Sequence, residues 1–245
     1  MLRRVVRDDV PLAPVHAAVH AKLRGIEPGR AETVLPAPDH DPDAALWLLG
    51  DFASGLAVTG TLEAGQRITT LRLTLHVLTR DIEGDELSAV GWLDEQLDGV
   101  ALSTAVITDK AGRTIARAQG RNAVLADEVA AGYGTTVPDW APAPFAVDEL
   151  LRDGAAPHEQ AVNTAAVVQG GALASLAARA LAEVLEGPAD EASAAFLRPV
   201  PADGRTVHAE AELEHGGRRL RSGRALLRND REHVVLSVSG LRYGG

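Results

Sequence analysis

The stretch Asn163-Thr-Ala-Ala-Val-Val-Gln169-Gly170-Gly171 runs directly into the helical pattern Ala172-Leu-Ala-Ser-Leu-Ala-Ala-Arg-Ala-Leu-Ala-Glu-Val-Leu-Glu186. In that pattern apolar residues recur at the spacing of a helix with one buried face. Because two glycines open the helix, a ligand can approach the backbone closely, and the N–H groups of the first turn have no partner within the helix. The sequence therefore predicts a helix N-terminus suited to an oxygen that gains negative charge.

A second helical pattern, from Ala44 to Val58, is apolar on nearly all sides. Since such a helix is normally buried all round, we expect it to lie under a sheet and against a second lobe. Asp51 is the only charged residue in this stretch. A carboxylate is seldom buried without a function, although a solvated aspartate at a gap in the packing explains the pattern equally well.

Each helical pattern is followed by four segments with the alternation of β-strands. They cover residues 68–78, 86–93, 100–107 and 113–120 in the first half, and residues 194–200, 206–213, 218–227 and 233–240 in the second. Landmarks recur 120 residues apart, as in Gly84 with Gly204 and Gly120 with Gly240. This indicates an internal duplication. We expect an N-terminal arm plus a first domain over residues 1–130, a linker rich in glycine and proline over 131–160, and a second domain over 161–245.

The composition narrows the function classes. A net charge of -10 argues against a general nucleic-acid binder, which needs a clustered basic surface. The absence of cysteine excludes disulfides and thiolate catalysis. The N-terminus lacks the apolar core of a signal peptide, and no apolar run is long enough for a bilayer. We therefore expect a soluble, cytoplasmic protein with neither nucleic acid nor membrane as a partner.

His16 and His20 lie one helical turn apart in a pattern that predicts a helix over Val15–Leu23. That spacing allows two histidines to share a metal ion. No glutamate lies between them and no third ligand is evident, so a plain surface helix is the preferred interpretation. We expect no metal and no cofactor.

The stretch from Asn163 to Gly171, followed by Phe196-Leu-Arg-Pro-Val200, resembles the hotdog-fold acyl-CoA thioesterases of the phenylacetate-pathway type. The family pattern is Asn, five residues, His-Gly-Gly, so Gln169 stands where the family usually has histidine. The family's carboxylate follows seven residues beyond the second glycine, and this chain has Ala178 there. The second half therefore keeps the glycine turn without the acid.

Residues 44–121 resemble the same family through Leu49–Ala57, Thr69-Thr70-Leu and Asp109–Ala116. Asp51 falls on the position of the family's catalytic carboxylate. Counting back from it, the His-Gly-Gly positions contain Pro42, Asp43 and Ala44. The first half therefore keeps the acid without the glycine turn.

The resemblance implies an α+β protein with two tandem hotdog folds, each an antiparallel sheet wrapped around a central helix, paired as a pseudo-dimer within the chain. One active site would then combine Asp51 with Asn163, Gln169 and Gly170. In such a site the Gly170 N–H would bind the thioester carbonyl, and Asp51 would act as general base or as nucleophile. The asparagine and the glutamine would position water and substrate.

A threonine of the first strand would orient Asp51. Counting back along the chain from Arg80, which matches the proline of Phe196-Leu-Arg-Pro199, favours Thr70. The spacing from Asp51 favours Thr69 instead. Gly171 would contact the substrate. The basic cluster Arg218, Arg219, Arg221 and Arg224 would bind phosphates of coenzyme A, although a solvated hairpin explains most of these arginines better.

The implied function is hydrolysis of an acyl-CoA thioester, with acyl-CoA as the partner and a homodimer of pseudo-dimers left open. A non-catalytic acyl-CoA-binding protein is the alternative: the replaced histidine argues mildly for it, and the retention of Asp51 with Asn163, Gln169 and Gly170 argues against it. A hotdog hydratase or dehydratase is a weaker alternative, because the Asp-x-Asn-Pro segment of those enzymes is missing.

Overall fold

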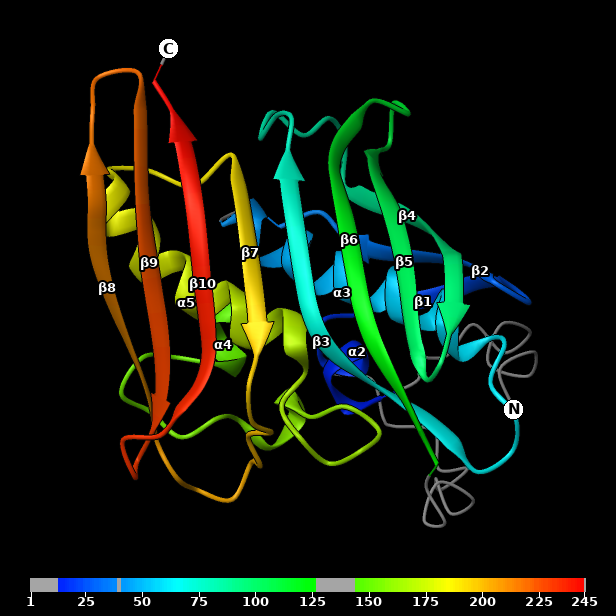
Figure 1. Ribbon diagram of the computed structural model, residues 1–245. Coiled ribbons are helices and arrows are strands. Elements are labelled where there is room, and N and C mark those ends of the chain that lie inside the picture. Colours follow the sequence, from blue (N-terminus) through cyan, green and yellow to red (C-terminus); the bar gives the residue numbers. More distant parts are fainter. Residues whose placement is uncertain (1–12, 39–40, 127–143, 245) are drawn as a thin grey trace.

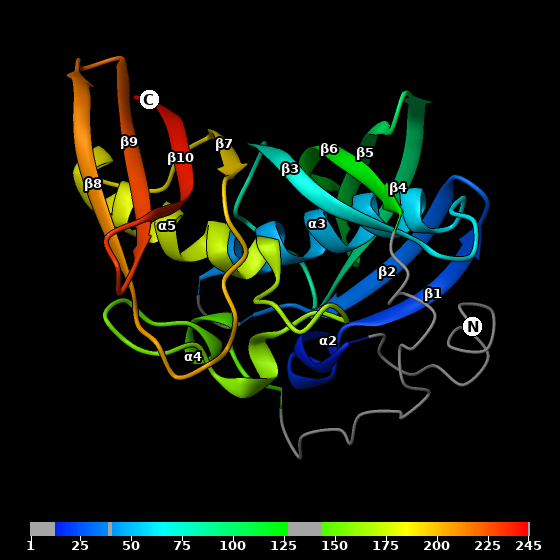
Figure 2. The same ribbon diagram turned by 60° about the horizontal axis from the view of Figure 1, so that its bottom comes forward.

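The computed structural model describes residues 13–38, 41–126 and 144–244. Their strands form one ten-stranded antiparallel sheet in the order β1-β2-β4-β5-β6-β3-β7-β10-β9-β8 (Figure 1). Two long helices, α3 and α5, contact each other and cover one face of this sheet (Figure 2). The expected α+β architecture of two hotdog folds is confirmed.

The first lobe is built around α3 (Pro42–Thr59), with the strands β3 (Gln66–Val77), β4 (Glu86–Leu97), β5 (Val100–Asp109) and β6 (Thr114–Ala126). The second lobe is built around α5 (Gly170–Leu185), with the strands β7 (Glu191–Phe196), β8 (Val207–Gly216), β9 (Leu220–Asn229) and β10 (Val234–Tyr243). β5 and β9 keep the spacing of 120 residues from end to end. The strand expected over 194–200 in fact ends at Phe196, because the chain then turns into a proline-containing loop.

The two lobes join where β3 pairs with β7. Their antiparallel register runs from His76 opposite Glu191 to Arg72 opposite Ala195, and a hydrogen bond of 3.0 Å joins the hydroxyls of Thr74 and Ser193. Below Arg72 the pairing ends, and β3 turns away from β7 (Figure 1). The sheet is therefore continuous at its centre and divided near the N-terminus of α5.

The apolar character of α3 is explained by burial on both sides. Its Leu46, Trp47, Leu48 and Leu49 are each at most 1% exposed. The helix contacts the first-lobe strands on one side and α5 on the other. Each such side chain contributes roughly 1.5–3 kcal/mol by leaving water. This packing fixes the position of the one charged residue in the middle of the helix.

The N-terminal segment differs from the sequence-based expectation. The helix α2 (Pro14–Ala18) stops before His20, and two unexpected strands follow, β1 (Lys22–Glu27) and β2 (Arg30–Pro36), of which β2 pairs with β4. The interpretation of a surface helix is wrong, because His16 is only 6% exposed and stacks on Phe52. Burial lowers the pKa of His16 to about 3, which keeps its imidazole neutral.

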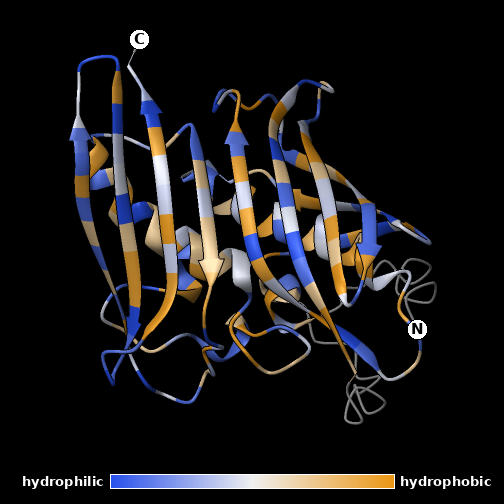
Figure 3. Cartoon of the chain, in the orientation of Figure 1, coloured by the Kyte–Doolittle hydropathy of each residue, from blue (hydrophilic) through white to orange (hydrophobic). Residues whose placement is uncertain are grey.

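The rest of the predicted linker, from residue 144, carries the short helices α4 (Val147–Leu150) and η2 (Glu159–Ala161), while residues 131–143 lie outside the described part. Hydrophobic and hydrophilic residues alternate along many strands, as expected for a sheet with one covered face (Figure 3). Of the helices in the described residues, none is both long and apolar enough to cross a bilayer.

Candidate active site

Asp51 lies in the middle of α3 and points at the N-terminus of α5 in the other lobe. Its Oδ1 accepts a hydrogen bond of 3.0 Å from the Thr70 hydroxyl. Its Oδ2 accepts bonds from the Gln169 side-chain amide at 2.5 Å and from the Gly171 N–H at 3.3 Å. Both lobes thus contribute donors to one carboxylate.

Gln169 is the N-cap residue of α5, and this role fixes the direction of its amide. The Oε1 accepts a hydrogen bond of 2.9 Å from the Ala172 N–H, which leaves the Nε2 to donate to Asp51. Gln169 is 4% exposed, so both ends of the amide are satisfied in the interior. In this site the residue that replaces histidine is a neutral donor to the acid.

Gly170 lies beside the carboxylate and retains partial exposure to solvent. A Cβ at this position would come within 3.0 Å of Asp51 Oδ2 and 3.1 Å of Phe196 Cε1. The Gly170 N–H has no acceptor in the described part of the chain. A side chain at this position would therefore crowd the carboxylate and the aromatic ring, whereas glycine leaves its backbone donor unused beside them.

Gly171 has a different role. A Cβ there would come within 2.5 Å of the Trp47 carbonyl oxygen and 2.7 Å of the Leu48 Cα. This glycine is buried and allows α5 to approach the backbone of α3. Its expected contact with substrate is therefore replaced by helix packing and by its N–H bond to Asp51.

The environment of Asp51 changes its acidity. Burial raises the pKa of Asp51 to about 6, against the lowering effect of the hydrogen bonds from Thr70, Gly171 and Gln169. A carboxyl group with a pKa near neutrality can accept a proton at neutral pH and return it later in the same reaction. Perturbed acids of this kind are concentrated at functional sites.

Of the two candidate threonines, the structure brings Thr70 to Asp51. Thr70 pairs with the buried Asn122, whereas Thr69 pairs with Ala123, so Thr69 points to the opposite face of the sheet. The residue after Thr70, Leu71, is an extra residue in the register between β3 and β6. Such bulges often occur beside active sites because they redirect neighbouring side chains.

Asn163 lies in the loop before α5, and among the described residues it forms no hydrogen bond with Asp51. Its side-chain oxygen accepts a hydrogen bond of 2.8 Å from the Ala165 N–H. Its backbone N–H donates to the Val167 carbonyl, which closes a tight turn. In this structure Asn163 shapes the loop that leads to Gln169.

The basic cluster lies elsewhere. Arg218 and Arg219 are exposed at the turn between β8 and β9, at the end of the second lobe opposite the end of β7 (Figure 1). Arg221 pairs with Glu186 at 2.9 Å, and Arg224 pairs with Glu212. These arginines do not join Asp51 and Gly170 within this chain.

The position that the duplication makes equivalent to this site, at the other end of the helix pair, holds an ion triad. Asp43, at the place of Gly170, accepts hydrogen bonds of 2.8 and 3.1 Å from Arg80. Arg80 also donates to Asp190 at 3.2 Å, and Asp190 follows Thr70 by the spacing of 120 residues. Ala178 offers no acid there. This ion triad was not predicted, although the charge of Arg80 at the position that matches the proline of Phe196-Leu-Arg-Pro199 was a signal for it.

Phe196 belongs to the stretch that carries the family resemblance, but it was not predicted to lie at the site. It ends β7, where pairing to β3 has stopped, and its ring borders the space at Gly170. Its place at the end of an apolar strand, directly before exposed residues, was the available signal.

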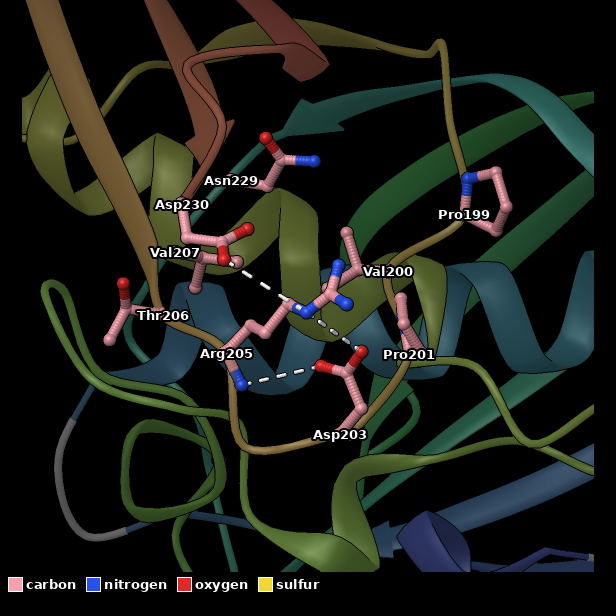
Figure 4. A pocket seen from close by; sticks show the side chains of 9 residues that line it. All are labelled: Pro199, Val200, Pro201, Asp203, Arg205, Thr206, Val207, Asn229 and Asp230. Atoms are coloured by element: carbon pink, nitrogen blue, oxygen red, sulfur yellow. Dashed lines mark hydrogen bonds and ion pairs between the residues drawn. The ribbon is translucent and has the colours of Figure 1, made fainter.

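A small cavity in the second lobe is separate from the site. It is lined by Pro199, Val200, Pro201, Asp203, Arg205, Thr206, Val207, Asn229 and Asp230 (Figure 4). The Arg205 guanidinium lies 3.3 Å from Asp203 and 3.9 Å from Asp230, so its charge is balanced. None of the groups that bond to Asp51 lines this cavity.

One family model and several solved structures are similar to this chain. The family model described as acyl-CoA thioesterase N-terminal domain matches residues 158–242. No curated protein sequence matches the chain.

Similar solved structures include three thioesterase-related proteins. The 12:0-ACP thioesterase from Umbellularia californica has a TM-score of 0.53 and 13% identity, over 79% of this chain and 83% of that chain. An acyl-ACP thioesterase from Bacteroides thetaiotaomicron has a TM-score of 0.53 and 11% identity, over 77% and 82%. A phenylacetic acid degradation-related protein from Ralstonia eutropha has a TM-score of 0.44 and 23% identity, over 50% and 98%.

The likeness to the two acyl-ACP thioesterases extends over both lobes and shows the common fold, while the family match lies on the second lobe. The chain therefore carries two hotdog folds in tandem, and its second lobe matches the acyl-CoA thioesterase family model.

Proposed function

We propose that this chain hydrolyses acyl-CoA thioesters at a single site shared by its two lobes. The observation that carries the proposal is Asp51 of α3, which is bonded to the N-terminus of α5 beside the unused N–H of Gly170. The acid comes from one lobe and the backbone donor from the other.

In the proposed reaction the thioester carbonyl accepts a hydrogen bond from the Gly170 N–H. As the carbonyl carbon becomes tetrahedral, its oxygen gains negative charge, which this donor at a helix N-terminus stabilises. Loss of one such donor typically costs roughly two to three powers of ten in rate. The coenzyme A thiolate then leaves, and the acid product is released.

Two roles remain compatible with the position of Asp51. As a general base, it removes a proton from a water molecule that attacks the carbonyl carbon. As a nucleophile, it attacks that carbon itself and forms an anhydride, which water then hydrolyses. In both cases Gln169 and Thr70 orient the carboxylate by donating to its two oxygens.

The test is a turnover assay across short, medium, long and aromatic acyl-CoAs, with release of free thiol as the readout. Hydrolysis of at least one class by the wild type, and its loss in Asp51→Asn, is the expected result. Saturable binding of a non-hydrolysable acyl-CoA analogue without any turnover would instead support the non-catalytic binding protein. No binding and no turnover would overturn both functions.

A further inference from the structure

Two arginines lie directly opposite each other on the outer face of the sheet. Arg72 of β3 pairs with Arg121 of β6. Their neighbours Leu73, Gly120 and Asn122 are buried on the helix side, so both arginines point away from the helices. Like charges directly opposite on antiparallel strands are destabilising.

No carboxylate balances this pair in the part of the chain that the structure describes. Both side chains are exposed, and neither forms an ion pair there. In the same row across the sheet, Arg121 lies beside Leu102 and Arg72 beside Ala195. Glu191, the outward-facing acid of β7, lies 3.5 Å from His76 instead. A chain with a net charge of -10 thus keeps two adjacent cations unneutralised.

The pair lies at the rim of the proposed site. Arg72 is two residues beyond Thr70, which bonds to Asp51 from the inner face. Pairing between β3 and β7 ends at Arg72 and Ala195, and the bulged Leu71 beside this end is 38% exposed. Phe196, the next residue of β7, borders the space at Gly170. Thr70 and Phe196 on the inner side and the arginine pair on the outer side therefore all lie within two residues of the point where the two strands separate.

We infer that Arg72 and Arg121 bind the phosphate groups of the acyl-CoA substrate; this inference rests on the proposed function. The phosphates of coenzyme A are separated from the thioester by the pantetheine arm, so their ligands belong outside the site and not beside Asp51. Guanidinium groups bind phosphate oxygens in a bidentate manner. A bound phosphate also relieves the repulsion between the two arginines. These residues replace the Arg218, Arg219 and Arg221 cluster as the phosphate ligands.

The experiment compares two thioesters of the same acyl group, one with coenzyme A and one with N-acetylcysteamine, which has no phosphates. The double variant Arg72→Gln, Arg121→Gln should raise the KM for the acyl-CoA about tenfold, because charge-assisted hydrogen bonds are lost. Its kcat, and its KM for the N-acetylcysteamine thioester, should stay within about twofold of wild type. Adenosine 3′,5′-bisphosphate should inhibit the wild type competitively and the double variant about tenfold more weakly.

Arg117→Gln is the matched control, because Arg117 is an exposed arginine on the same strand and face as Arg121 but lies opposite His76, at the other end of the β3 and β7 pairing. Its KM values should match those of wild type. Thermal unfolding of the double variant should occur at or above the wild-type temperature, because a like-charge pair has been removed.

An unchanged KM for the acyl-CoA in the double variant would overturn the inference, as would an equal rise for both thioesters. A rise confined to acyl groups on an acidic carrier protein would assign the pair to that protein and also overturn it. If the wild type hydrolyses no thioester, the proposed function fails. Direct binding of adenosine 3′,5′-bisphosphate to wild type and double variant then decides the role of the arginines separately.

Discussion

The two ends of the helix pair carry opposite chemistry, although the duplication makes them equivalent. At one end Asp51 faces Gln169 and Gly171, and its pKa is raised to about 6. At the other end Asp43 and Asp190 both bond to Arg80, and no acid stands at Ala178. One end has an acid with neutral donors, whereas the other has an ion triad of one arginine and two aspartates.

Under the proposed function, this difference means that one end has kept a complete set of catalytic groups and the other has replaced its set with an ion triad. Symmetric pairing of two identical lobes would place an acid and a glycine turn at both ends. Here each lobe has kept one part, so that a single complete set forms. The other end is filled by Arg80, which joins the first lobe to Asp190 and to the Ala189 carbonyl of the second. We expect one end to determine activity and the other to determine stability.

The largest difference should appear when the aspartate at each end is replaced by asparagine. Asp51→Asn should lower kcat about a thousandfold, because an amide can neither accept a proton nor attack the carbonyl. Asp43→Asn should leave kcat within about twofold, since Asp43 is bonded to Arg80 at the other end. Steady-state hydrolysis of the best acyl-CoA measures both. Comparable activity losses in the two variants would mean that the ends are not divided in this way.

Substitution of the two glycines of α5 should have different effects, on activity at Gly170 and on stability at Gly171. Gly170→Ala should lower kcat/KM about a hundredfold, because its Cβ enters the space between Asp51 and Phe196 and displaces the substrate. Gly171→Ala should instead lower the free energy of unfolding by about 1–3 kcal/mol, because its Cβ would overlap the Trp47 carbonyl. Kinetics and urea unfolding on both variants test this. Full activity in a folded Gly170→Ala protein would remove Gly170 from the site.

Substitution of Arg80 should lower the free energy of unfolding and leave the activity at the Asp51 end unchanged. Arg80→Met leaves Asp43 and Asp190 without their partner, and an unsatisfied, partly buried group costs about 1–3 kcal/mol of unfolding free energy. Arg224→Met, which breaks the exposed pair with Glu212, should cost less than about 1 kcal/mol. Urea unfolding compares the two. A kcat of Arg80→Met far below wild type would show that the triad also supports catalysis.

The raised pKa of Asp51 should be visible in the pH profile. Burial stabilises the protonated form, so the reactive carboxylate is lost as the pH falls through about 6 and not near the usual value for aspartate. We therefore expect kcat/KM to be nearly flat above pH 7 and to lie about tenfold below this plateau at pH 5. A plateau that continues down to pH 4 would show that Asp51 is either less buried in the substrate-free enzyme or not the titrating group.

Much of the fold could be predicted from the sequence because local patterns and the duplication agreed. The apolar surround of Asp51 indicated a helix buried on both sides, and alternation indicated the strands on which Thr70 and Phe196 lie. The N-terminal strands were missed, since residues 22–36 lack regular alternation and one irregularity interrupts the pairing of β1 with β2. His16 was misjudged because its stacking partner, Phe52, is distant in the sequence.

The site could be predicted only in part for a related reason. Asp51, Gln169 and Gly170 were found because each stands in a recognisable local pattern. The choice between Thr69 and Thr70 depends on a register set by β6, and the pairing of Arg72 with Arg121 depends on the same register. The triad around Arg80 draws its members from three separate segments. Contacts that are decided by strand register or by lobe docking leave no local signal.

The smallest effect should follow from restoring the missing acid. Ala178→Asp returns a carboxylate to the inactive end, but the positions that face it contain Pro42, which has no N–H, and Asp43, whose charge repels a developing oxyanion. We therefore expect no new activity, either alone or in the Asp51→Asn background.

Titration of the wild type with a non-hydrolysable acyl-CoA analogue should likewise saturate near one equivalent per chain. Rescue of Asp51→Asn by Ala178→Asp would require that the inactive end still supplies an oxyanion donor. Such a donor would have to come from a group other than the start of α3, because Pro42 has no N–H and the Asp43 carboxylate, bonded to Arg80, repels an oxyanion.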